Sequence, residues 1–408
     1  MASLHHVEVC TANAARLLRL FTGGFGFGCL GRRVTPRCLQ WVVRSGHATF
    51  VITQKHRQVP ADAPTDARFA SGEPWTLFCC ADGPHRRDSV FNVALSVRDV
   101  WRTAERAARA GGRLLQPPVR VTDQLGSVEY AVVGSVCGNL VHTLLNRDRY
   151  TGAFLPRFGS GGSAATVEDD GAGRDDEHVD HVTLTCRRGE STALVDWYRR
   201  VFGMRRFRLN SEDSEADGVR LEGDVGMALK AMEYWRCAET GLSSPPTSDR
   251  EPTLKFVIAE SLQDGSHVET FNREHGGPGV QHIGLHTRHI AGRVGEMARR
   301  GVRFRKPPAA YYSQTGKGDE ISRAGVCGDE LRLFQQLGLL LDSEADEDSH
   351  MGNRYLTQVF SEPLFEEDTF FMEVLERRGA RGFGQGNITA LARSIVEDQR
   401  QRREADAS

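Results

Sequence analysis

The stretch that decides the fold is "VQHIGLHTRHIAGRVGEMARRGVRFRKPP", Val280–Pro308, because the chain contains a second copy of it. The earlier copy, "VFNVALSVRDVWRTAERAARAGGRLLQPP" at Val90–Pro118, aligns with it without a gap at a constant offset of 190 residues. Each copy predicts a strand, a helix that stops at a glycine, and the start of a second strand that leads into Pro-Pro. A repeat of this length indicates a duplicated structural unit.

Two further pairs of segments extend the repeat. "LHHVEV" (Leu4–Val9) aligns with "VDHVTL" (Val179–Leu184), and each is followed by a helical pattern that ends in an aromatic-Gly turn. A weaker match relates "NLVHTLLNR" (Asn139–Arg147) to "FFMEVLERR" (Phe370–Arg378) at an offset of 230 residues, so that Arg147 aligns with Arg377. The pattern predicts an α+β fold of duplicated βαβββ modules, in which each half of the chain forms a half-open barrel.

The segment between the halves, "GSGGSAATVEDDGAGRDDEH", is rich in Gly and Ser and then acidic, which is typical of a solvated linker. We therefore expect an N-terminal domain at 1–158, a linker at 159–178, a C-terminal domain at 179–400 and a polar tail at 401–408. A length of 408 residues suits two domains better than one.

Composition excludes several classes of protein. The formal net charge is −2, which gives no bias toward nucleic acid, and no apolar run approaches the roughly 20 residues that a transmembrane helix needs. The nine cysteines are scattered and form no CxxC pair, which argues against a disulfide framework and against a thiolate zinc site, and favours a reducing compartment.

The N-terminal 61 residues are poor in acid and rich in arginine, with Glu8 as their only acidic residue. Such a start resembles an organelle import signal. The alternative is that Leu4–Val9 is already a folded strand, which leaves no room for a cleavable peptide.

The repeat also identifies a candidate metal site. A lone histidine in a core strand, such as His282, is ordinarily a hydrogen-bonded core residue, so a metal site requires partners. At three aligned strand positions the second half has His181, His282 and Glu373, whereas the first half has His6, Asn92 and Thr143. Two imidazoles and one carboxylate are the ligand set of non-haem Fe(II) oxygenases, and three ligands leave positions open for substrate and dioxygen. The asymmetry therefore predicts one Fe(II) per chain, in the second half.

Other candidates near these positions are weaker. Alternation along the strand places Asp180 on the face opposite His181, so we do not expect it to bind the metal. His286 and His289 are expected at the surface or in support of the site. No role is assigned to the histidines in polar segments, which are His178, His267, His275 and His350.

The second half resembles the catalytic half of the 4-hydroxyphenylpyruvate dioxygenase family, in the vicinal-oxygen-chelate superfamily. The motifs that carry the resemblance are "VDHVTL", "GPGVQHIGL", "PPAAYY" and "YLTQVFSEPLFEEDTFFMEVLERRGARGFGQGN" with the helix after it. The first half resembles the family's degenerate half, which binds no metal. The resemblance implies the vicinal-oxygen-chelate fold, with His181, His282 and Glu373 as iron ligands.

The resemblance also implies a substrate pocket for a small aromatic α-keto acid. The residues at its substrate-binding positions are Gln281, Gln358, Phe360, Phe371, Phe383 and Asn387. Three positions depart from the family pattern, because Ala231 stands for a serine, Ala259 for an asparagine and Ile388 for a phenylalanine. "GFGQGN" and the segment that follows it predict a lid helix at 388–399, with Asn387 as its N-cap, rather than a dinucleotide-binding loop.

The implied reaction is oxidative decarboxylation of 4-hydroxyphenylpyruvate with O2. The altered pocket favours benzylic hydroxylation to 4-hydroxymandelate, which one mitochondrial branch of the family feeds into ubiquinone head-group synthesis. The alternatives are a homogentisate-forming dioxygenase, an extradiol ring-cleaving dioxygenase, and a non-catalytic binding or assembly protein with a relic site. The lid motif and Gln358 argue against ring cleavage. The sequence leaves the oligomeric state open between a monomer and a homodimer.

Overall fold

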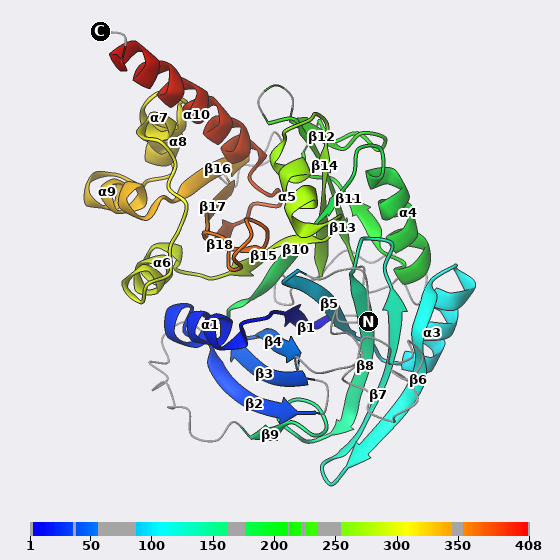
Figure 1. The fold of residues 1–408 in the computed structure, drawn as a ribbon. Coiled ribbons are helices and arrows are strands. Elements are labelled where there is room, and N and C mark those ends of the chain that lie inside the picture. The colour runs from blue at the N-terminus through cyan, green and yellow to red at the C-terminus, as the bar shows by residue number, and fades with distance from the viewer. Residues whose placement is uncertain are drawn as a thin grey trace.

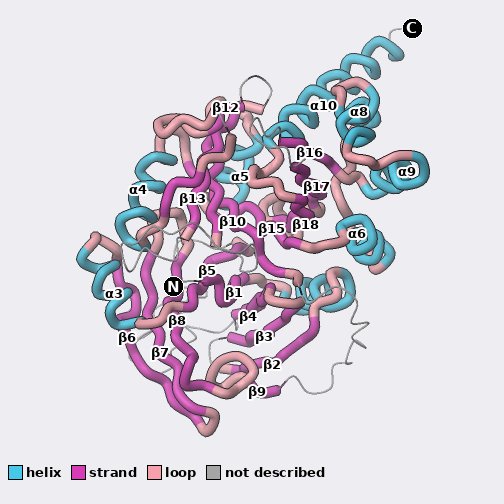
Figure 2. Tube along the Cα trace, turned by 180° about the vertical axis from the view of Figure 1, so that it is seen from behind, coloured by secondary structure: helices cyan, strands magenta, loops and turns pink. Residues whose placement is uncertain are grey.

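The computed structural model describes residues 3–35, 38–55, 87–160, 176–210, 212–221, 223, 225–234, 254–344 and 354–406. They form two curled β-sheets, one from each half of the chain, with helices on their outer faces (Figures 1 and 2). This arrangement confirms the predicted α+β fold of two half-open barrels.

The first half contains the predicted βαβββ module twice. The first copy comprises β1 (Ser3–Cys10), α1 (Ala14–Arg19) with a π-helical turn η1 (Leu20–Gly24), β2 (Gly28–Val34), β3 (Cys38–Ser45) and β4 (Ala48–Lys55). The second comprises β5 (Ser89–Ser96), α3 (Val100–Arg109), β6 (Arg113–Asp123), β7 (Gly126–Gly134) and β8 (Val141–Tyr150). The short strand β9 (Gly159–Ser160) closes the edge of this sheet against β2.

The second half repeats the pattern with insertions. Its first copy comprises β10 (His178–Cys186), α4 (Ser191–Phe202), β11 (Arg205–Phe207), β12 (Val219–Leu221), β13 (Met227–Glu233), β14 (Lys255–Ser261) and α5 (His267–His275). Its second comprises β15 (Val280–His286), α6 (Ile290–Arg299), α7 (Ala309–Ser313), α8 (Lys317–Arg323), α9 (Gly328–Leu337), β16 (Leu340–Glu344), β17 (Arg354–Phe360) and β18 (Phe371–Arg378). Helix α10 (Gln385–Asp406) follows and extends beyond the body of the molecule at the C-terminal end (Figure 1).

Strand pairing is the same in the two sheets. In the first, β1 pairs with β4 in parallel and with β5 in antiparallel, and β5 then pairs with β8 in parallel. In the second, β10 pairs with β14, β15 pairs with β10, and β18 pairs with β15 in the same respective orientations. The two central strands of each sheet therefore occupy equivalent places, which confirms the duplication read from the sequence.

Amphipathic helices cover the sheets because each buries its apolar face. In α3, Asp99 caps the first turn by accepting a hydrogen bond from the Arg102 amide, and Val100, Ala104 and Ala107 are buried along one stripe. Their side chains join a continuous apolar core that also contains α4 and α6 residues of the second half. A shared core fixes the two halves against each other.

Polar contacts also join the halves. The buried Glu177 carboxylate pairs with Arg293 of α6, with 2.5 Å between Oε1 and Nε, and it also accepts a hydrogen bond from Ser45 of β3. At the ends of the predicted linker, Gly159–Ser160 thus form a strand and Glu177 is buried, while residues 161–175 lie outside the described part of the chain. The arginine-rich start contributes β1, a central strand, and therefore belongs to the folded sheet.

Among the residues that the structure describes, no helix has the length and apolar character required to span a membrane.

Candidate metal centre and substrate pocket

The three predicted ligands come together on one face of three neighbouring strands, β10, β15 and β18. Cross-strand pairing places His181 opposite Gly284, and Gly284 opposite Glu373, so that these residues form one row across the sheet. His282 lies two residues before Gly284 on the central strand and therefore points to the same face. The sheet register alone thus arranges the three side chains as a triangle.

Gly284 makes room for this triangle. A β-carbon at Gly284 would lie 2.3 Å from Cε1 of the His181 ring, a distance at which the ring would have to move. The absence of a side chain in the centre of the row lets the imidazole cross over β15 toward Glu373. We therefore regard Gly284 as part of the site, although it offers no ligand atom.

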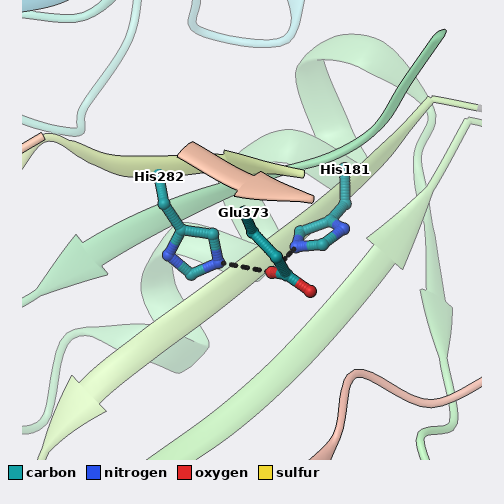
Figure 3. A group of neighbouring side chains, drawn as sticks. All are labelled: His181, His282 and Glu373. Carbon is teal, nitrogen blue, oxygen red and sulfur yellow. Dashed lines mark ion pairs between the residues drawn. The ribbon is translucent and has the colours of Figure 1, made fainter. Parts of the chain in front are cut away.

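Both imidazoles present Nε2 to the carboxylate, as Figure 3 shows. Oε2 of Glu373 lies 3.2 Å from Nε2 of His181 and 3.4 Å from Nε2 of His282. The other nitrogens face acceptors, because Nδ1 of His181 lies 2.8 Å from Oδ1 of Asp180 and Nδ1 of His282 lies 3.3 Å from Oε1 of Gln281. An Nδ1–H donated to each acceptor leaves Nε2 as the lone-pair nitrogen, which is the form that binds a cation.

The charges of the site fit a cation as well. Burial would raise the pKa of Glu373, but the adjacent His181 and His282 rings lower it to about 2, so the carboxylate is ionised. Burial disfavours the charged form of His181, yet Glu373 and Asp180 raise its pKa above the ordinary value. Burial lowers the pKa of His282. The negative charges of Glu373 and Asp180 that raise the pKa of His181 also favour a metal cation beside its ring.

Asp180 fixes the orientation of His181 from behind. Burial would raise the pKa of Asp180, but the charges of Arg377 and Lys255 hold it well below its usual range. Arg377 donates two hydrogen bonds to the carboxylate, at 2.7 Å to Oδ2 and 2.8 Å to Oδ1. Asp180 lies outside the cluster of three potential ligands, and its carboxylate holds the ring by the carboxylate–histidine arrangement common at metal sites.

Within the described residues, His181, His282 and Glu373 form the one group of three or more potential ligands that could hold a metal ion, with all ligand atoms within 4.8 Å of one another. Two imidazoles and a carboxylate on one side of an open pocket fit an ion that keeps coordination positions for other molecules. The residues present therefore fit the Fe(II) that the sequence predicts.

A pocket of about 360 Å³ opens over the three ligands. Its walls are mostly apolar and come from the barrel strands, from the loop before α7 and from α10. Of the predicted substrate-binding residues, Gln281, Phe360, Phe371 and Phe383 line it. Phe371 stacks on His282 with 4.9 Å between ring centroids, and Phe383 meets the edge of His181 at 4.8 Å.

The structure places Gln358 and Asn387 differently. Both are fully buried, Asn387 within the first turn of α10 and Gln358 beside Gly384 just before that helix, and neither is among the residues that line the pocket. Among the described residues, Gln358 has no hydrogen-bond partner for either amide atom, and Nδ2 of Asn387 has none either. Because unpaired buried amides are costly, a bound molecule or water is expected to complete them.

The predicted N-cap at Asn387 is wrong. Helix α10 begins at Gln385, so Asn387 lies inside the first turn, and its Oδ1 accepts a hydrogen bond of 2.7 Å from the Tyr311 hydroxyl. The helix is also longer than the predicted 388–399, because the polar residues up to Asp406 continue it. Its pocket-facing residues are Ile388, Leu391, Ala392 and Ile395, as expected for a lid.

Two of the three departures from the family pattern face the pocket. Ala259 and Ile388 line it, whereas Ala231 is fully buried in the adjoining apolar cluster and is not among the lining residues. The wall that these residues share is therefore apolar.

Sequence analysis gave no pocket role to five polar residues that line the pocket, which are Thr183, Ser266, His267, Arg305 and Lys306. His267 lines it at the start of α5, and its Nδ1 lies 3.2 Å from Nε2 of Gln281. Arg305 lines it from the segment between α6 and α7. Both lie in polar segments, where no periodicity indicates which way a side chain points.

The other histidines of the second half that the structure describes are not part of the ligand cluster. His286 and His178 stack on each other at 4.5 Å, and His289 is exposed. His275 is buried against Phe271 at the end of α5. His350 lies outside the described residues.

Comparison with known proteins places this fold and site in a family. The chain matches the model of the Glyoxalase/Bleomycin resistance protein/Dioxygenase superfamily over residues 3–141 and again over residues 178–319. It is 37% identical over 405 residues to the 4-hydroxyphenylpyruvate dioxygenase-like protein of Homo sapiens, a match that covers 98% of this chain and 96% of the human protein. The corresponding protein of Rattus norvegicus is 36% identical over 385 residues, with 92% and 91% covered.

More distant similarity extends to enzymes and to solved structures. The 4-hydroxyphenylpyruvate dioxygenase of Neurospora crassa is 27% identical over 405 residues, with 97% of this chain and 91% of the fungal protein covered. A mutant of 4-hydroxymandelate synthase from Streptomyces coelicolor superposes with a TM-score of 0.69 at 23% identity, and the match covers 98% of this chain and 99% of that one. The structural likeness establishes a common fold, and the sequence matches establish the family. The chain therefore belongs to the Glyoxalase/Bleomycin resistance protein/Dioxygenase superfamily and, within it, to the 4-hydroxyphenylpyruvate dioxygenase family of enzymes.

Proposed function

We propose that the chain is an Fe(II)-dependent dioxygenase that converts a 4-hydroxyphenylpyruvate-type α-keto acid and O2 to 4-hydroxymandelate and CO2. The observation that carries the proposal is the convergence of His181, His282 and Glu373 within 4.8 Å at the floor of an apolar pocket. When bound there, Fe(II) would supply the redox chemistry with O2 that oxidative decarboxylation needs.

The protein's own task is to hold the ring of the substrate. The aromatic side chains of Phe360, Phe371 and Phe383 line the pocket next to the ligands and offer flat apolar surfaces for an aromatic ring. The Gln281 amide, with its oxygen near His282 and its nitrogen near His267, can orient both the ligand and a polar group of the substrate.

The lid helix α10 keeps water away from the reacting groups. Ile388, Leu391 and Ile395 close one side of the pocket with apolar side chains. Carboxylates of β16 hold the start of the helix in place, since Asp342 accepts a hydrogen bond of 3.0 Å from the Gly386 amide and pairs with Lys317 at 2.9 Å. A dry pocket strengthens electrostatic interactions and limits side reactions.

The apolar wall decides the product. 4-Hydroxymandelate and homogentisate are isomers, so the position of the ring selects between hydroxylation of the benzylic carbon and of the ring. Ala259 and Ile388 line the pocket and offer neither a hydrogen bond nor an aromatic face. A missing hydrogen bond changes binding by about 1–3 kcal/mol, which favours one ring position by about 5-fold to 150-fold.

Product analysis tests the proposal. The purified chain would be loaded with Fe(II) and 4-hydroxyphenylpyruvate without oxygen and then exposed to O2. The aromatic products would be separated by chromatography and identified by retention time and mass. We expect mainly 4-hydroxymandelate. The change Ala231→Ser, Ala259→Asn, Ile388→Phe should raise the homogentisate fraction, and the double change at the two lining positions alone should produce most of that rise. Wild-type protein that forms mainly homogentisate would favour that activity instead.

We further propose that the product supplies ubiquinone head-group synthesis in mitochondria. The family resemblance supports this location, whereas the arginine-rich start lies in the folded sheet as β1. Fractionation of cells that express the chain with a C-terminal tag would test it, and a signal confined to the cytosol would contradict it.

A further inference from the structure

Arg305 is a partly buried cation in the pocket wall. Its backbone amide donates a hydrogen bond of 2.8 Å to the Phe360 carbonyl, which ties this segment to β17 beside the metal centre. Its guanidinium carbon lies 5.5 Å from the centroid of the Phe371 ring, the same ring that stacks on the ligand His282 at 4.9 Å. One aromatic side chain thus separates a fixed positive charge from the metal site.

Asp368, outside the pocket lining, pairs with Arg305, but the lining itself offers little to offset that charge. The lining has one carboxylate, Glu373, which faces the two ligand histidines, and the neighbouring lining cation Lys306 is exposed. Burial lowers the pKa of His267, and the Arg305 charge lowers it further, so this lining ring is neutral at pH 7. The Arg305 side chain is 38% exposed, so solvent screens part of its charge, but the apolar walls of the cleft direct the remaining field toward an incoming anion.

We propose that Arg305 is the residue that selects an anionic substrate, by attracting the carboxylate of the α-keto acid as it enters and guiding it past Phe371 to the metal centre. The inference rests on the proposed function, because it assigns a residue of the same pocket to recognition of the substrate's charge.

Asp368 competes with the substrate for this cation. Its Oδ1 lies 2.7 Å from Nη2 of Arg305, and 58% of the Asp368 side chain is exposed to solvent. A solvent-exposed pair of this kind is weak, so a substrate carboxylate can displace it. Asp368 therefore holds Arg305 at the pocket when substrate is absent and gives it up when substrate arrives.

The test compares three variants by steady-state kinetics with 4-hydroxyphenylpyruvate. In Arg305→Ala we expect KM to rise about tenfold at low ionic strength with kcat within twofold of wild type, because steering acts on encounter. Added salt should raise the wild-type KM but have little effect on the variant. Asp368→Asn should shift KM in the opposite direction, because it frees the guanidinium.

Arg303→Ala is the matched control, since Arg303 lies two residues away, pairs with Glu362 and is 79% exposed outside the pocket. Its KM and salt dependence should equal those of wild type. Equal KM values for Arg305→Ala and Arg303→Ala would overturn the inference.

Calorimetry with the iron-loaded protein without oxygen separates this inference from the proposed function. Phenylpyruvate should bind Arg305→Ala about tenfold more weakly than wild type, whereas its uncharged methyl ester should bind both alike. An equal loss for acid and ester would show that Arg305 only shapes the pocket. Absence of turnover in the wild type would contradict the proposed function, and the comparison of acid with ester would still decide the role of Arg305.

Discussion

The two halves of the chain have the same strand pairing but fill the space over their central strands differently. In the second half, His181, His282 and Glu373 direct their ligand atoms toward one another and line a pocket. In the first half, the equivalent strand positions hold His6, Asn92 and Thr143, all of them buried.

In the first half these side chains hydrogen-bond within the protein. The Glu8 carboxylate accepts hydrogen bonds from Gln40 at 2.7 Å, from Thr53 at 2.6 Å and from Asn92 at 3.2 Å. Asn92 also donates to the Thr143 hydroxyl at 2.9 Å. The polar groups are therefore satisfied by their neighbours, which removes the unpaired donors and acceptors that a ligand site requires.

One β-carbon adds to the contrast. Ala94 stands opposite His6 in the first sheet, at the place that Gly284 has opposite His181 in the second. In the second half the missing β-carbon gives His181 room to reach Glu373, while in the first half His6 instead contacts His5 and Phe154, with 5.3 Å between the His6 and Phe154 ring centroids. The comparison teaches that the backbone sets the geometry of three converging strands, and a few side chains decide whether they make a site or a filled core.

Removal of the lid should have the largest effect on turnover. A chain that ends after Gly386 lacks Ile388, Leu391 and Ile395, and water would enter the pocket. We expect turnover to fall by more than about 100-fold while metal content is unchanged. Comparable losses of activity follow when residues that support a metal site are removed. Metal analysis and the ratio of O2 consumed to product formed would be measured together.

The control for the lid is a chain that ends after residue 400, which keeps every pocket-lining residue of α10. Its turnover should match that of the full chain. If the shorter truncation turned over substrate with tight coupling, α10 would not be a functional lid.

Gly284→Ala should make the second half more like the first. The new β-carbon would meet the His181 ring at 2.3 Å and push it out of the row. We expect metal affinity to fall about 10- to 100-fold with the fold retained, measured by metal titration and circular dichroism.

Gly292→Ala is the matched control, because a β-carbon there meets no atom within 4 Å. Its metal affinity should not change. The reverse substitution in the first half, Ala94→Gly, should leave the metal content at one ion per chain. Unchanged affinity in Gly284→Ala would show that His181 does not need the open position.

The smallest effect expected concerns stability in acid. Burial lowers the pKa of His6 to about 3, below the 6.5 of an unfolded chain, so the unfolded state takes up a proton between these values and the folded state does not. Stability is therefore full above about pH 6.5 and falls as the pH drops toward 3. At pH 5 the loss due to His6 is about 2 kcal/mol.

Urea unfolding of the metal-free protein at pH 7 and pH 5 would measure the contribution of His6 to this loss of stability. Between pH 7 and pH 5, the free energy of unfolding of His6→Gln should fall by about 2 kcal/mol less than that of wild type. At the equivalent position His181 has a raised pKa, so its stabilising contribution is present below the unfolded value and is lost as the pH rises through the folded one. His181→Gln should therefore change the pH dependence with the opposite sign, and the same sign for both would contradict the assigned environments.

Much of the fold could be predicted from sequence because duplication leaves a direct record. The constant offset between Val90–Pro118 and Val280–Pro308 predicted matched strand–helix units, and both occur in equivalent places. The convergence of His181, His282 and Glu373 followed from the same alignment, since aligned strand positions share a face of equivalent sheets.

Features that depend on tertiary contacts could not be predicted. Strand alternation correctly placed Asp180 off the ligand face. It could not predict that the Asp180 carboxylate contacts Nδ1 of His181, because that contact depends on the buried Arg377 that holds the carboxylate. Arg305 and His267 enter the pocket from outside the strands, where periodicity gives no direction. Asn387 looked like a cap by residue type, but contacts of Asp342 and Tyr311 accompany a helix start three residues earlier, at Gln385.

The most direct test of the central claim is the metal content of three proteins titrated anaerobically with Fe(II): wild type, Glu373→Ala, and Thr143→Ala at the equivalent position of the first half. The account predicts one tightly bound ion per chain in wild type and in Thr143→Ala, and none that survives desalting in Glu373→Ala, with circular dichroism unchanged in all three. A tightly bound ion in Glu373→Ala, or its loss in Thr143→Ala, would contradict the assignment of the site to the second half.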